Sequence, residues 1–353
     1  HQVVVRRTAP GAAGTVMGNL AALGAGALSA FGFVGDDGEG YDLREGLKRM
    51  GCDIAALFVT PDRMTPTYQK HRDASRPGLD GEIERYDTKN RTPTPPPLID
   101  RILTALDERL PHLDAVILLD QVEEDECGVI TARVREALAQ QARRQSNIIF
   151  WADSRRRIDR FRGVFIKPNQ FEAVGRQSPK PEDRVETADL QRAVLALRER
   201  NGAPVCATCG ERGMFVSDPA PQMVRGVRVE GPIDTTGAGD SATAGAVLAL
   251  AAGGDTYKLP YGHRGVNQPV QDLLTRRCYV TSQNHGYAVR DDALPPDWEP
   301  WFVNTNDGTN EGIRSRVRPF ASVQFHPEAH PGPTDTGFLF DDFLRLVGAM
   351  RAR

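Results

Sequence analysis

The chain has 353 residues, of which 40% are hydrophobic and 26% are charged, the balance of a soluble globular protein. Its 44 basic and 47 acidic side chains give a net charge of −3, which excludes a broad nucleic-acid-binding surface. No apolar run approaches the roughly 20 residues that span a bilayer, and no signal peptide is visible. Five cysteines, few and odd in number, indicate a reduced, cytoplasmic protein. The length predicts two domains, and the first residue, His1, suggests an internal start.

Strand-like and helix-like segments alternate through residues 1–254, which predicts an α/β layered domain with a parallel sheet. Short apolar runs predict buried strands at residues 114–120, 147–152, 163–166 and 204–208. Two helices are expected, over residues 124–144 and 187–200, and Asn201-Gly202 ends the second. Residues 58–97 are polar and interrupt this alternation, so they form either a solvated loop or β-excursion or a lid over a substrate site.

The composition changes near residue 255. Four of the seven histidines and two of the three tryptophans fall in the last 99 residues. Helical periodicity is nearly absent there until residues 338–353. We therefore expect two domains, residues 1–254 and 255–353, although no Gly/Ser-rich or Pro-rich linker separates them.

The most informative segment is Asp234-Thr-Thr-Gly-Ala-Gly-Asp240, which leads into a helix of small residues at 241–250. Backbone N–H groups and the helix dipole make an anion site at such a helix start. Gly237 and Gly239 let a phosphate approach because they have no Cβ. Asp240 repels phosphate by itself, so it fits a base that takes a proton from a hydroxyl attacking a phosphoryl group. A Gly-rich loop with an Asp helix cap is the structural alternative.

This string resembles the signature of the PfkB/ribokinase family of carbohydrate kinases, and the resemblance extends over residues 3–253. Residues 10–24, residues 33–38 and Gly40 resemble the family's N-terminal segments. Within the family, the heptose-phosphate kinases of ADP-heptose synthesis are most similar, on the strength of residues 67–72, 152–155 and 161–172. The resemblance implies a ribokinase-like three-layer α/β sheet fold, ATP and Mg²⁺ as cofactors, and phosphoryl transfer to a sugar or sugar phosphate.

The resemblance also implies residue roles. Asp240 would be the general base, and Gly237, Ala238 and Gly239 would form the anion hole for the transferring phosphoryl group. Asn169 and Glu172 match an N-x-x-E element that organises Mg²⁺ and phosphate through water. Further contacts are implied for the nucleotide at Thr208, Gly210 and Gly213, for the sugar at Gly11, and for a sugar phosphate at Lys70 and Arg72. The alternatives are that Lys70 and Arg72 are solvated charges and that Glu172 is a helix-start carboxylate.

Three departures from the family pattern leave open whether kinase activity is impaired. The family's first strand, which carries a sugar-binding Asp, is not found in this sequence. Pro10 and Gly14 stand where the family has a Gly and an Asn. The part that completes the adenine pocket is not found after Gly254. We therefore expect an incomplete kinase domain.

The last part of the chain carries a second resemblance. The strings that carry it lie at residues 255–270, 281–287, 304–312 and 323–328. They resemble the C-terminal part of the carbamoyl-phosphate synthase small subunit, a class I glutamine amidotransferase, over residues 251–345. The resemblance implies that His326 is a base oriented by Glu328, and that glutamine is held by Asn284, Gly286 and Tyr287. It also implies a carbamoyl-phosphate synthase large subunit as a possible partner.

The nucleophile of that second family is not found. Counting back without gaps places its elbow cysteine at Ala242, and Cys278 does not lie on a strand-to-helix elbow. Without a thiolate no glutaminyl thioester forms, so we do not expect glutaminase activity. We interpret Cys206-Ala-Thr-Cys209 as a packing pair rather than a metal site.

Both families have an Ala-rich helix at residues 248–254, so the two pieces join within shared sequence. The chain is therefore either a natural fusion or the product of recombination or misassembly. Two functions stay open, an ATP-dependent sugar kinase and a non-catalytic chain whose tail docks on a synthase large subunit or exposes half a domain.

Overall fold

The computed structural model describes residues 3–23, 25–73, 75–76, 81–180, 182–225, 237–251, 256–317, 321–327, 335–342 and 345. The chain divides into two compact units, His1–Leu248 and Ala249–Arg353, and each is described by itself. Among the described residues, no helix combines the length and the apolar character needed to cross a membrane.

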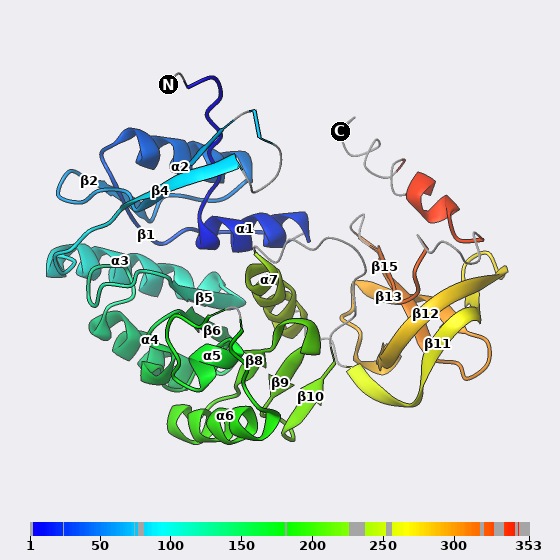
Figure 1. Cartoon of the computed structure of the whole chain (residues 1–353). Helices are drawn as coiled ribbons and strands as arrows, with labels where there is room; N and C mark the ends of the chain where they lie inside the picture. The colour runs from blue at the N-terminus through cyan, green and yellow to red at the C-terminus, as the bar shows by residue number, and fades with distance from the viewer. Residues whose placement is uncertain are drawn as a thin grey trace. The chain divides into compact units, whose positions relative to one another are not determined.

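A parallel sheet forms the centre of the first unit (Figure 1). Strands β5 (Ala115–Asp120), β6 (Ile149–Ser154) and β7 (Phe165–Ile166) pair in this order. Parallel bridges from Ile166 to Val205 and from Asn169 to Thr208 continue the sheet to β8 (Cys206–Thr208). The four predicted strands are therefore confirmed, and their carboxyl ends meet at one edge of the sheet.

Smaller strand groups complete the first unit. Strand β8 continues into an antiparallel meander with β9 (Met214–Val216) and β10 (Gln222–Val224). Strands β1 (Gly32–Gly35) and β2 (Leu57–Thr60) form a parallel pair. Strands β3 (Thr67–Arg72) and β4 (Glu82–Thr88) form an antiparallel hairpin, so residues 58–97 contain a β-excursion, one of the alternatives left open for them.

Helices cover the sheet of the first unit (Figure 1). Their bounds are α1 (Ala12–Ala22), α2 (Gly38–Arg49), α3 (Pro96–Arg109), α4 (Ala132–Arg144), α5 (Gln170–Ala173), α6 (Thr187–Asn201) and α7 (Ala238–Ala251). Short 3-10 turns lie at η2 (Leu110–His112), η3 (Ile158–Arg160) and η4 (Gly210–Arg212). Helix α6 buries Leu190 and Val194 completely in the core. Gly202 ends α6 with a φ of 78°, as predicted from Asn201-Gly202.

The predicted helix over residues 124–144 is wrong in its first eight residues. Helix α4 begins only after Thr131, whose hydroxyl caps it by accepting a hydrogen bond from Val134 N at 3.3 Å. Glu126 has a φ of 58°, which is incompatible with a right-handed helix. A turn therefore replaces the start of the predicted helix.

A tight polar turn follows β1 and explains the spacing of the Phe33–Gly40 segment. Asp37 accepts hydrogen bonds from Gly40 N at 2.7 Å, Thr65 N at 2.8 Å and Thr65 Oγ1 at 2.7 Å. A Cβ on Gly40 would lie 2.5 Å from the Gly35 carbonyl oxygen. Glycine is therefore required at position 40 by close backbone approach.

A buried ion pair joins the ends of β5 and β6. Arg157 donates to both carboxylate oxygens of Asp120, at 2.7 and 3.0 Å, and also to the carbonyls of Val122 and Glu123. The Ser154 hydroxyl donates to Asp120 at 2.7 Å. The side chains of Arg157 and Asp120 are 5% and 3% exposed, so each charge depends on the other.

The second unit is an antiparallel sheet in the strand order β12-β11-β13-β14-β15. The strands are β11 (Thr256–Asp272), β12 (Cys278–Val289), β13 (Trp298–Asn304), β14 (Asn310–Ser315) and β15 (Ala321–Val323), and a 3-10 turn, η5 (Asp291–Ala293), precedes β13. Val270, Phe302 and Phe325 form its core. The helix expected over residues 338–353 lies largely outside the described residues.

Candidate functional site

The carboxyl ends of β6 and β7 bring together two oppositely charged side chains. Asp153 lies in β6, and Lys167 follows β7, where its backbone N–H donates to the Ala152 carbonyl at 2.8 Å. Lys167 Nζ lies 2.7 Å from Asp153 Oδ2, and both side chains are nearly buried. The Lys167 ammonium is also at the start of α7, 3.4 Å from where a Cβ on Gly239 would lie. A cation is thus held beside a glycine backbone.

Asp240 lies in the first turn of α7, one residue after Gly239. Burial raises the pKa of its carboxyl group, and the charge of Asp153 raises it further. Lys167 and Arg155 act in the opposite direction, but the pKa stays above its ordinary value. A half-buried carboxylate of raised pKa is a better proton acceptor than an ordinary aspartate.

Helix α1 lies against the start of α7. Asn19 Nδ2 donates to Ser241 Oγ at 3.1 Å, and a Cβ on Gly237 would lie 3.6 Å from Thr15 Cγ2. Gly237 has a φ of 80°, a conformation that favours glycine. Gly11 is the N-cap of α1, four residues before Thr15, so the structure brings the Gly11 segment close to the Gly237–Asp240 turn.

Asn169 and Glu172 form a capping box at the start of the short helix α5. Asn169 Oδ1 accepts from the backbone N–H groups of Phe171 and Glu172, at 2.8 and 2.9 Å. Glu172 Oε2 accepts from Asn169 N at 2.7 Å. The alternative of a helix-start carboxylate therefore describes the geometry of Glu172.

Glu172 also interacts through its charge with Asp153 and Lys167. Burial raises the pKa of Glu172 to about 7, although the hydrogen bond from Asn169 N lowers it, and Asp153 raises it further. A cavity of about 280 Å³ borders Glu172 and Asn169 and is also lined by Arg155, Arg156 and Arg176. The capping carboxylate thus borders a cavity lined by three arginines and Glu123, and the charges of Asp153 and Lys167 also act on it.

The predicted nucleotide residues lie at the end of β8. Thr208 is paired with Asn169 by the parallel bridge, and its N–H donates to the Pro168 carbonyl at 2.9 Å. Gly210 and Gly213 have φ values of 60° and 97° in the turn that leads to β9. The sheet therefore places Thr208 beside the N-x-x-E element.

Other predicted residues lie on separate elements. Lys70 and Arg72 are exposed residues of β3, in a hairpin that forms its own two-stranded sheet. The Cys206-Ala-Thr-Cys209 pair packs at the end of β8, where Cys209 is buried and burial raises the pKa of Cys206 to about 11. Cys209 thus lies in the core, whereas Cys206 is only partly buried.

In the second unit, the predicted glutamine-binding residues lie on β12. The backbones of Asn284, Gly286 and Tyr287 are described as part of this strand, but their side chains and Glu328 lie outside the described residues. His326 N donates to the Ser282 carbonyl of the same strand at 2.9 Å.

The two positions considered for a nucleophile are also resolved. Cys278 is exposed and is the first residue of β12, which pairs with β11 as a hairpin. Ala242 lies within α7. Cys278 therefore lies at a strand start and not at a strand-to-helix elbow.

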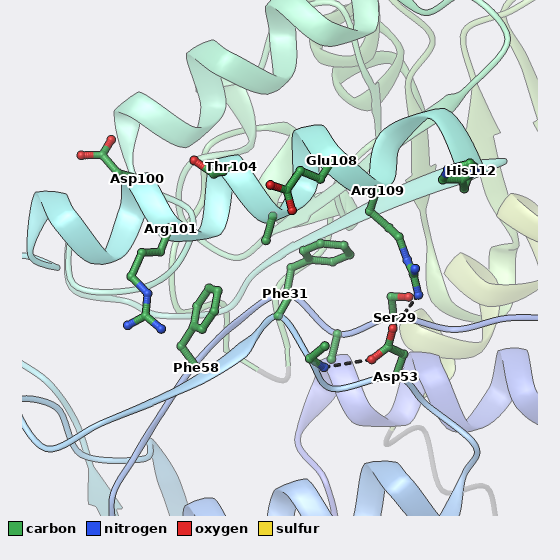
Figure 2. A pocket seen from close by; sticks show the side chains of 14 residues that line it. Ser29, Phe31, Asp53, Phe58, Asp100, Arg101, Thr104, Glu108, Arg109 and His112 are labelled. Carbon is green, nitrogen blue, oxygen red and sulfur yellow. Dashed lines mark hydrogen bonds and ion pairs between the residues drawn. The ribbon is translucent and has the colours of Figure 1, made fainter.

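The cavity of about 700 Å³ in Figure 2 lies elsewhere, at the amino ends of β1 and β2. Figure 2 shows Phe31 and Phe58 facing the side chains of α3, where Arg101 lies over the Phe58 ring at 4.2 Å. This cavity is at the opposite strand ends from Asp153 and Asp240. It therefore does not extend the charged cluster.

Sequence reasoning gave no role to Asp153 or Lys167, although both lie in segments that resemble heptose-phosphate kinases. A signal was available, because each is a charged residue at or directly after the end of a buried strand. The assembled cluster is a base, a buried cation and a glycine-lined helix start, which suits transfer of a phosphoryl group.

Two family models match the chain. The model of the pfkB family of carbohydrate kinases matches residues 1–259, and the model of class I glutamine amidotransferases matches residues 246–346. Among solved structures, the PfkB protein from Polaromonas sp. JS666 is 16% identical with a TM-score of 0.50, covering 71% of this chain and 81% of that one. A structure from Clostridium perfringens has a TM-score of 0.50 at 19% identity, covering 71% of this chain and 77% of its own. These two likenesses support a ribokinase-like fold.

The C-terminal part is similar to curated carbamoyl phosphate synthase small chains. That of Methanocaldococcus jannaschii is 61% identical over 100 residues, which are 28% of each chain. That of Symbiobacterium thermophilum is 50% identical over 154 residues, 44% of this chain and 41% of that one. The chain therefore spans less than half the length of these relatives.

Proposed function

We propose, from the premise that this chain belongs to the pfkB family of carbohydrate kinases, that its first unit transfers the γ-phosphoryl group of ATP to a sugar or sugar phosphate. The observation that carries this proposal is the position of Asp240 in the first turn of α7, after two glycines and near the buried Lys167. A base, an anion cradle and a fixed cation are the parts that this chemistry needs.

The proposed step follows from these positions. Asp240 accepts the proton of the attacking hydroxyl, whose oxygen bonds to the γ-phosphorus while the bond to the β,γ-bridging oxygen breaks and releases ADP. The backbone N–H groups at Gly237, Ala238 and Gly239 and the Lys167 ammonium stabilise the negative charge on the phosphoryl oxygens. Gly11 borders the sugar, and Thr208, Gly210 and Gly213 border the nucleotide.

The residues near Glu172 fit Mg²⁺ bound through water. Asn169 uses its amide oxygen to cap α5, so it orients Glu172 and is not itself a ligand. Glu172 Oε2 accepts from Asn169 N, so the other carboxylate oxygen of Glu172 would hold Mg²⁺ through water. When bound, Mg²⁺ supplies charge neutralisation on the phosphates.

We propose a heptose phosphate as the acceptor. Lys70 and Arg72 lie together on β3, and two cations on a hairpin suit an anionic substrate over which the hairpin closes as a lid. We also propose a cytoplasmic location, supported by five cysteines that are all unpaired thiols.

The test is release of ADP by the purified full chain with Mg-ATP and heptose 7-phosphate, followed by a panel of other sugars. Asp240→Asn should lower kcat by about 10²–10⁴-fold, because it removes the base without changing the side-chain size. Asp189→Asn is the matched control, since Asp189 has the same first-turn position on α6 but is exposed. Equal rates for the wild type and Asp240→Asn on every sugar would refute the proposal.

The acceptor is tested separately. Lys70→Ala and Arg72→Ala should raise KM for the sugar phosphate at least tenfold and leave KM for ATP unchanged, because only the anionic acceptor loses a charge partner. Equal KM values for phosphorylated and unphosphorylated sugars would contradict the heptose-phosphate assignment while leaving the kinase assignment intact.

For the second unit we propose a role without glutamine hydrolysis. The observation that favours it is Cys278, the one cysteine of residues 249–353, at the exposed start of a hairpin strand. The role we propose is docking on a carbamoyl-phosphate synthase large subunit, supported by the 61% identity to a small chain.

Two measurements test the proposal for the second unit. No glutamate should be released from glutamine, and no adduct of a glutamine-analogue electrophile should form at Cys278. The chain should co-elute with a purified large subunit in size-exclusion chromatography. Separate elution would contradict docking, and a Cys278 adduct would contradict the lack of glutaminase chemistry.

A further inference from the structure

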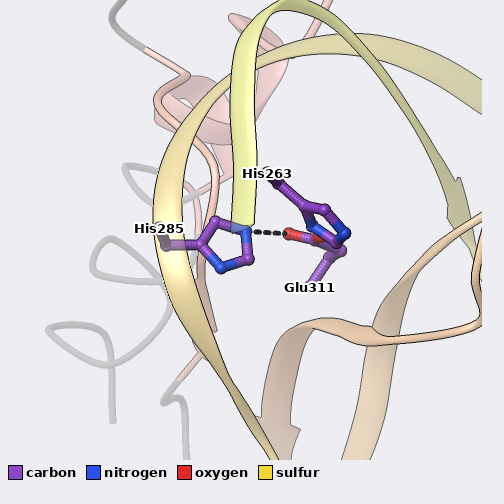
Figure 3. Close-up of side chains that lie close together, drawn as sticks. All are labelled: His263, His285 and Glu311. Carbon is purple, nitrogen blue, oxygen red and sulfur yellow. Dashed lines mark hydrogen bonds and ion pairs between the residues drawn. The ribbon is translucent and has the colours of Figure 1, made fainter. Parts of the chain in front are cut away.

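Two histidines and a glutamate meet inside the second unit, and none of the three has been given a catalytic role above. His263 on β11 lies directly opposite His285 on β12, and their rings are 4.9 Å apart in an edge-to-face arrangement. Glu311 comes from β14, which is not a neighbour of β12 in the sheet order. Figure 3 shows the Glu311 carboxylate reaching the space between the two rings.

The imidazole nitrogens of the two histidines lie close to the carboxylate oxygens of Glu311. His263 Nδ1 lies 2.6 Å from Glu311 Oε1, and His285 Nε2 lies 3.2 Å from Glu311 Oε2. One ligand atom of each residue lies within 4.8 Å of the others. The three side chains can therefore reach one common point.

Burial leaves one carboxylate oxygen of Glu311 without a hydrogen bond among the described residues. The Glu311 side chain is fully buried, and its Oε2 atom accepts no hydrogen bond from the described part of the chain, although His285 Nε2 is near. A buried carboxylate oxygen without a hydrogen bond is strongly unfavourable in the absence of a compensating charge. Glu311 thus points a poorly satisfied anionic atom into the group.

The surroundings of His263 have the form of an outer ligand shell, whereas His285 Nε2 lies 3.1 Å from Gln283 Oε1, a contact that an ion bound at Nε2 would replace. His263 Nε2 lies 2.8 Å from Asp307 Oδ2, and Asp307 is fixed by Thr309, whose hydroxyl donates to it at 2.7 Å. A metal-bound histidine commonly donates its second ring N–H to a carboxylate in this way, which fixes the tautomer. Asn304 Nδ2 supports Glu311 Oε1 at 3.3 Å.

We propose that His263, His285 and Glu311 bind one first-row divalent transition-metal ion, preferentially Zn²⁺. Two imidazoles and one carboxylate are a ligand set of zinc, and nitrogen ligands disfavour Mg²⁺ and Ca²⁺. Ligand atoms around a tetrahedral zinc ion lie about 3.3 Å apart at ordinary bond lengths. The distances of 2.6 and 3.2 Å involve the two different oxygens of Glu311, and one ligand atom of each residue lies within 4.8 Å of the others, so the side chains must adjust to reach this spacing around an ion.

The ion would connect strands that the sheet hydrogen bonds do not join directly. His263 and His285 come from the β11–β12 hairpin, whereas Glu311 lies on β14. Bound metal therefore stabilises the folded second unit, since the three ligands are brought together only by folding.

The experiment uses the full chain, stripped with a chelator and desalted. Zn²⁺ is titrated against a chromophoric competitor, and Co²⁺ is added separately to record its visible d–d spectrum. We expect one tightly bound Zn²⁺ per chain and a tetrahedral Co²⁺ spectrum. In a Trp151→Phe background, we also expect a higher melting temperature of the second unit, followed by the fluorescence of Trp298 and Trp301.

Three variants locate the ion. Glu311→Gln keeps the side-chain shape and should weaken Zn²⁺ binding by more than 100-fold, and His285→Ala should abolish the Co²⁺ spectrum. Asp307→Asn, at a partly exposed positioning residue, should weaken binding about 10–100-fold and serves if the buried variants fail to fold. His112→Gln, at an exposed histidine of the first unit, is the matched control and should bind as the wild type does.

Two results would overturn the proposal. The first is a wild-type chain that binds neither Zn²⁺ nor Co²⁺, which would mean that the group is held by hydrogen bonds and ion pairs alone. The second is unchanged Zn²⁺ affinity in folded Glu311→Gln or in Asp307→Asn, which would place the ion elsewhere on the chain.

Discussion

Replacing Arg157 by methionine tests the contribution of the buried ion pair between β5 and β6. Methionine retains most of the side-chain length but removes the guanidinium, so Asp120 keeps only the Ser154 hydroxyl as a donor among its described partners. Four hydrogen bonds from Arg157 are lost at once, two to Asp120 and one each to the carbonyls of Val122 and Glu123.

The magnitude follows from burial. Both side chains are at most 5% exposed, so the remaining carboxylate stays out of water. Breaking such a pair by removing one partner costs about 3–5 kcal/mol. This is a large fraction of the 5–15 kcal/mol that stabilises a typical domain. Arg160→Met is the matched control, because Arg160 and Asp125 form a half-exposed pair worth about 0–1 kcal/mol.

Urea unfolding measures the change in the free energy of unfolding for Arg157→Met and for Arg160→Met. When Trp151 is the only tryptophan, the fluorescence signal reports on the first unit alone. Trp151 is buried and stacks on Phe165, so its fluorescence follows this unit in a background carrying Trp298→Phe and Trp301→Phe. The double variant Asp120→Asn, Arg157→Met should be more stable than the sum of the single changes predicts, by about 0.5–3 kcal/mol.

Two results would refute this reasoning about the ion pair. One is a cost for Arg157→Met no greater than that of Arg160→Met. The other is strict additivity in the double variant, because residues that share a buried contact must be coupled.

Three further changes have defined outcomes. Burial opposes ionisation of Asp37, but hydrogen bonds from Thr65 and Gly40 hold the pKa of its carboxyl group below the usual value. The ionised Asp37 therefore stabilises the fold above its unfolded-state pKa, and this contribution is lost as the pH falls through its folded-state pKa. Thermal melts below about pH 4 should show a flatter pH profile for Asp37→Asn than for the wild type, and parallel profiles would contradict this. Gly40→Ala should cost about 1–3 kcal/mol in urea unfolding, because its Cβ would lie 2.5 Å from a carbonyl oxygen, whereas Gly38→Ala has open space and should cost less. Burial raises the pKa of Asp240, so the acid limb of the kcat/KM profile should lie above about pH 3.9, and a limb below that value would count against Asp240 as the base.

Local patterns were sufficient for the four strands β5 to β8 and for the helix ending at Gly202, because apolar runs and a left-handed glycine act over few residues. The helix predicted from residue 124 failed because apolar spacing continued through a turn that Glu126 and Thr131 impose. Periodicity detects an apolar face, but it does not detect the backbone conformation that stops a helix.

The charged side chains of the sites also differ in whether the sequence could predict their contacts. Asp240 and its glycines lie within one short string, so the sequence predicted them together. Lys167 and Asp153 meet only because β6 and β7 pair in parallel. His263 and Glu311 are 48 positions apart and meet through the folding of the sheet, so no spacing in the sequence indicates their contact.

The contact between α1 and α7 has a consequence for synthesis of the chain. Asn19 and Ser241 are 222 positions apart, and Ala244 of α7 covers apolar residues of α1 and β5 such as Val16 and Leu119. At a typical rate of about 5–20 residues per second, the ribosome needs on the order of ten seconds to proceed from β5 to α7. During that interval this apolar surface is open to chaperones and to self-association, and the first unit closes only when one of its last helices has emerged.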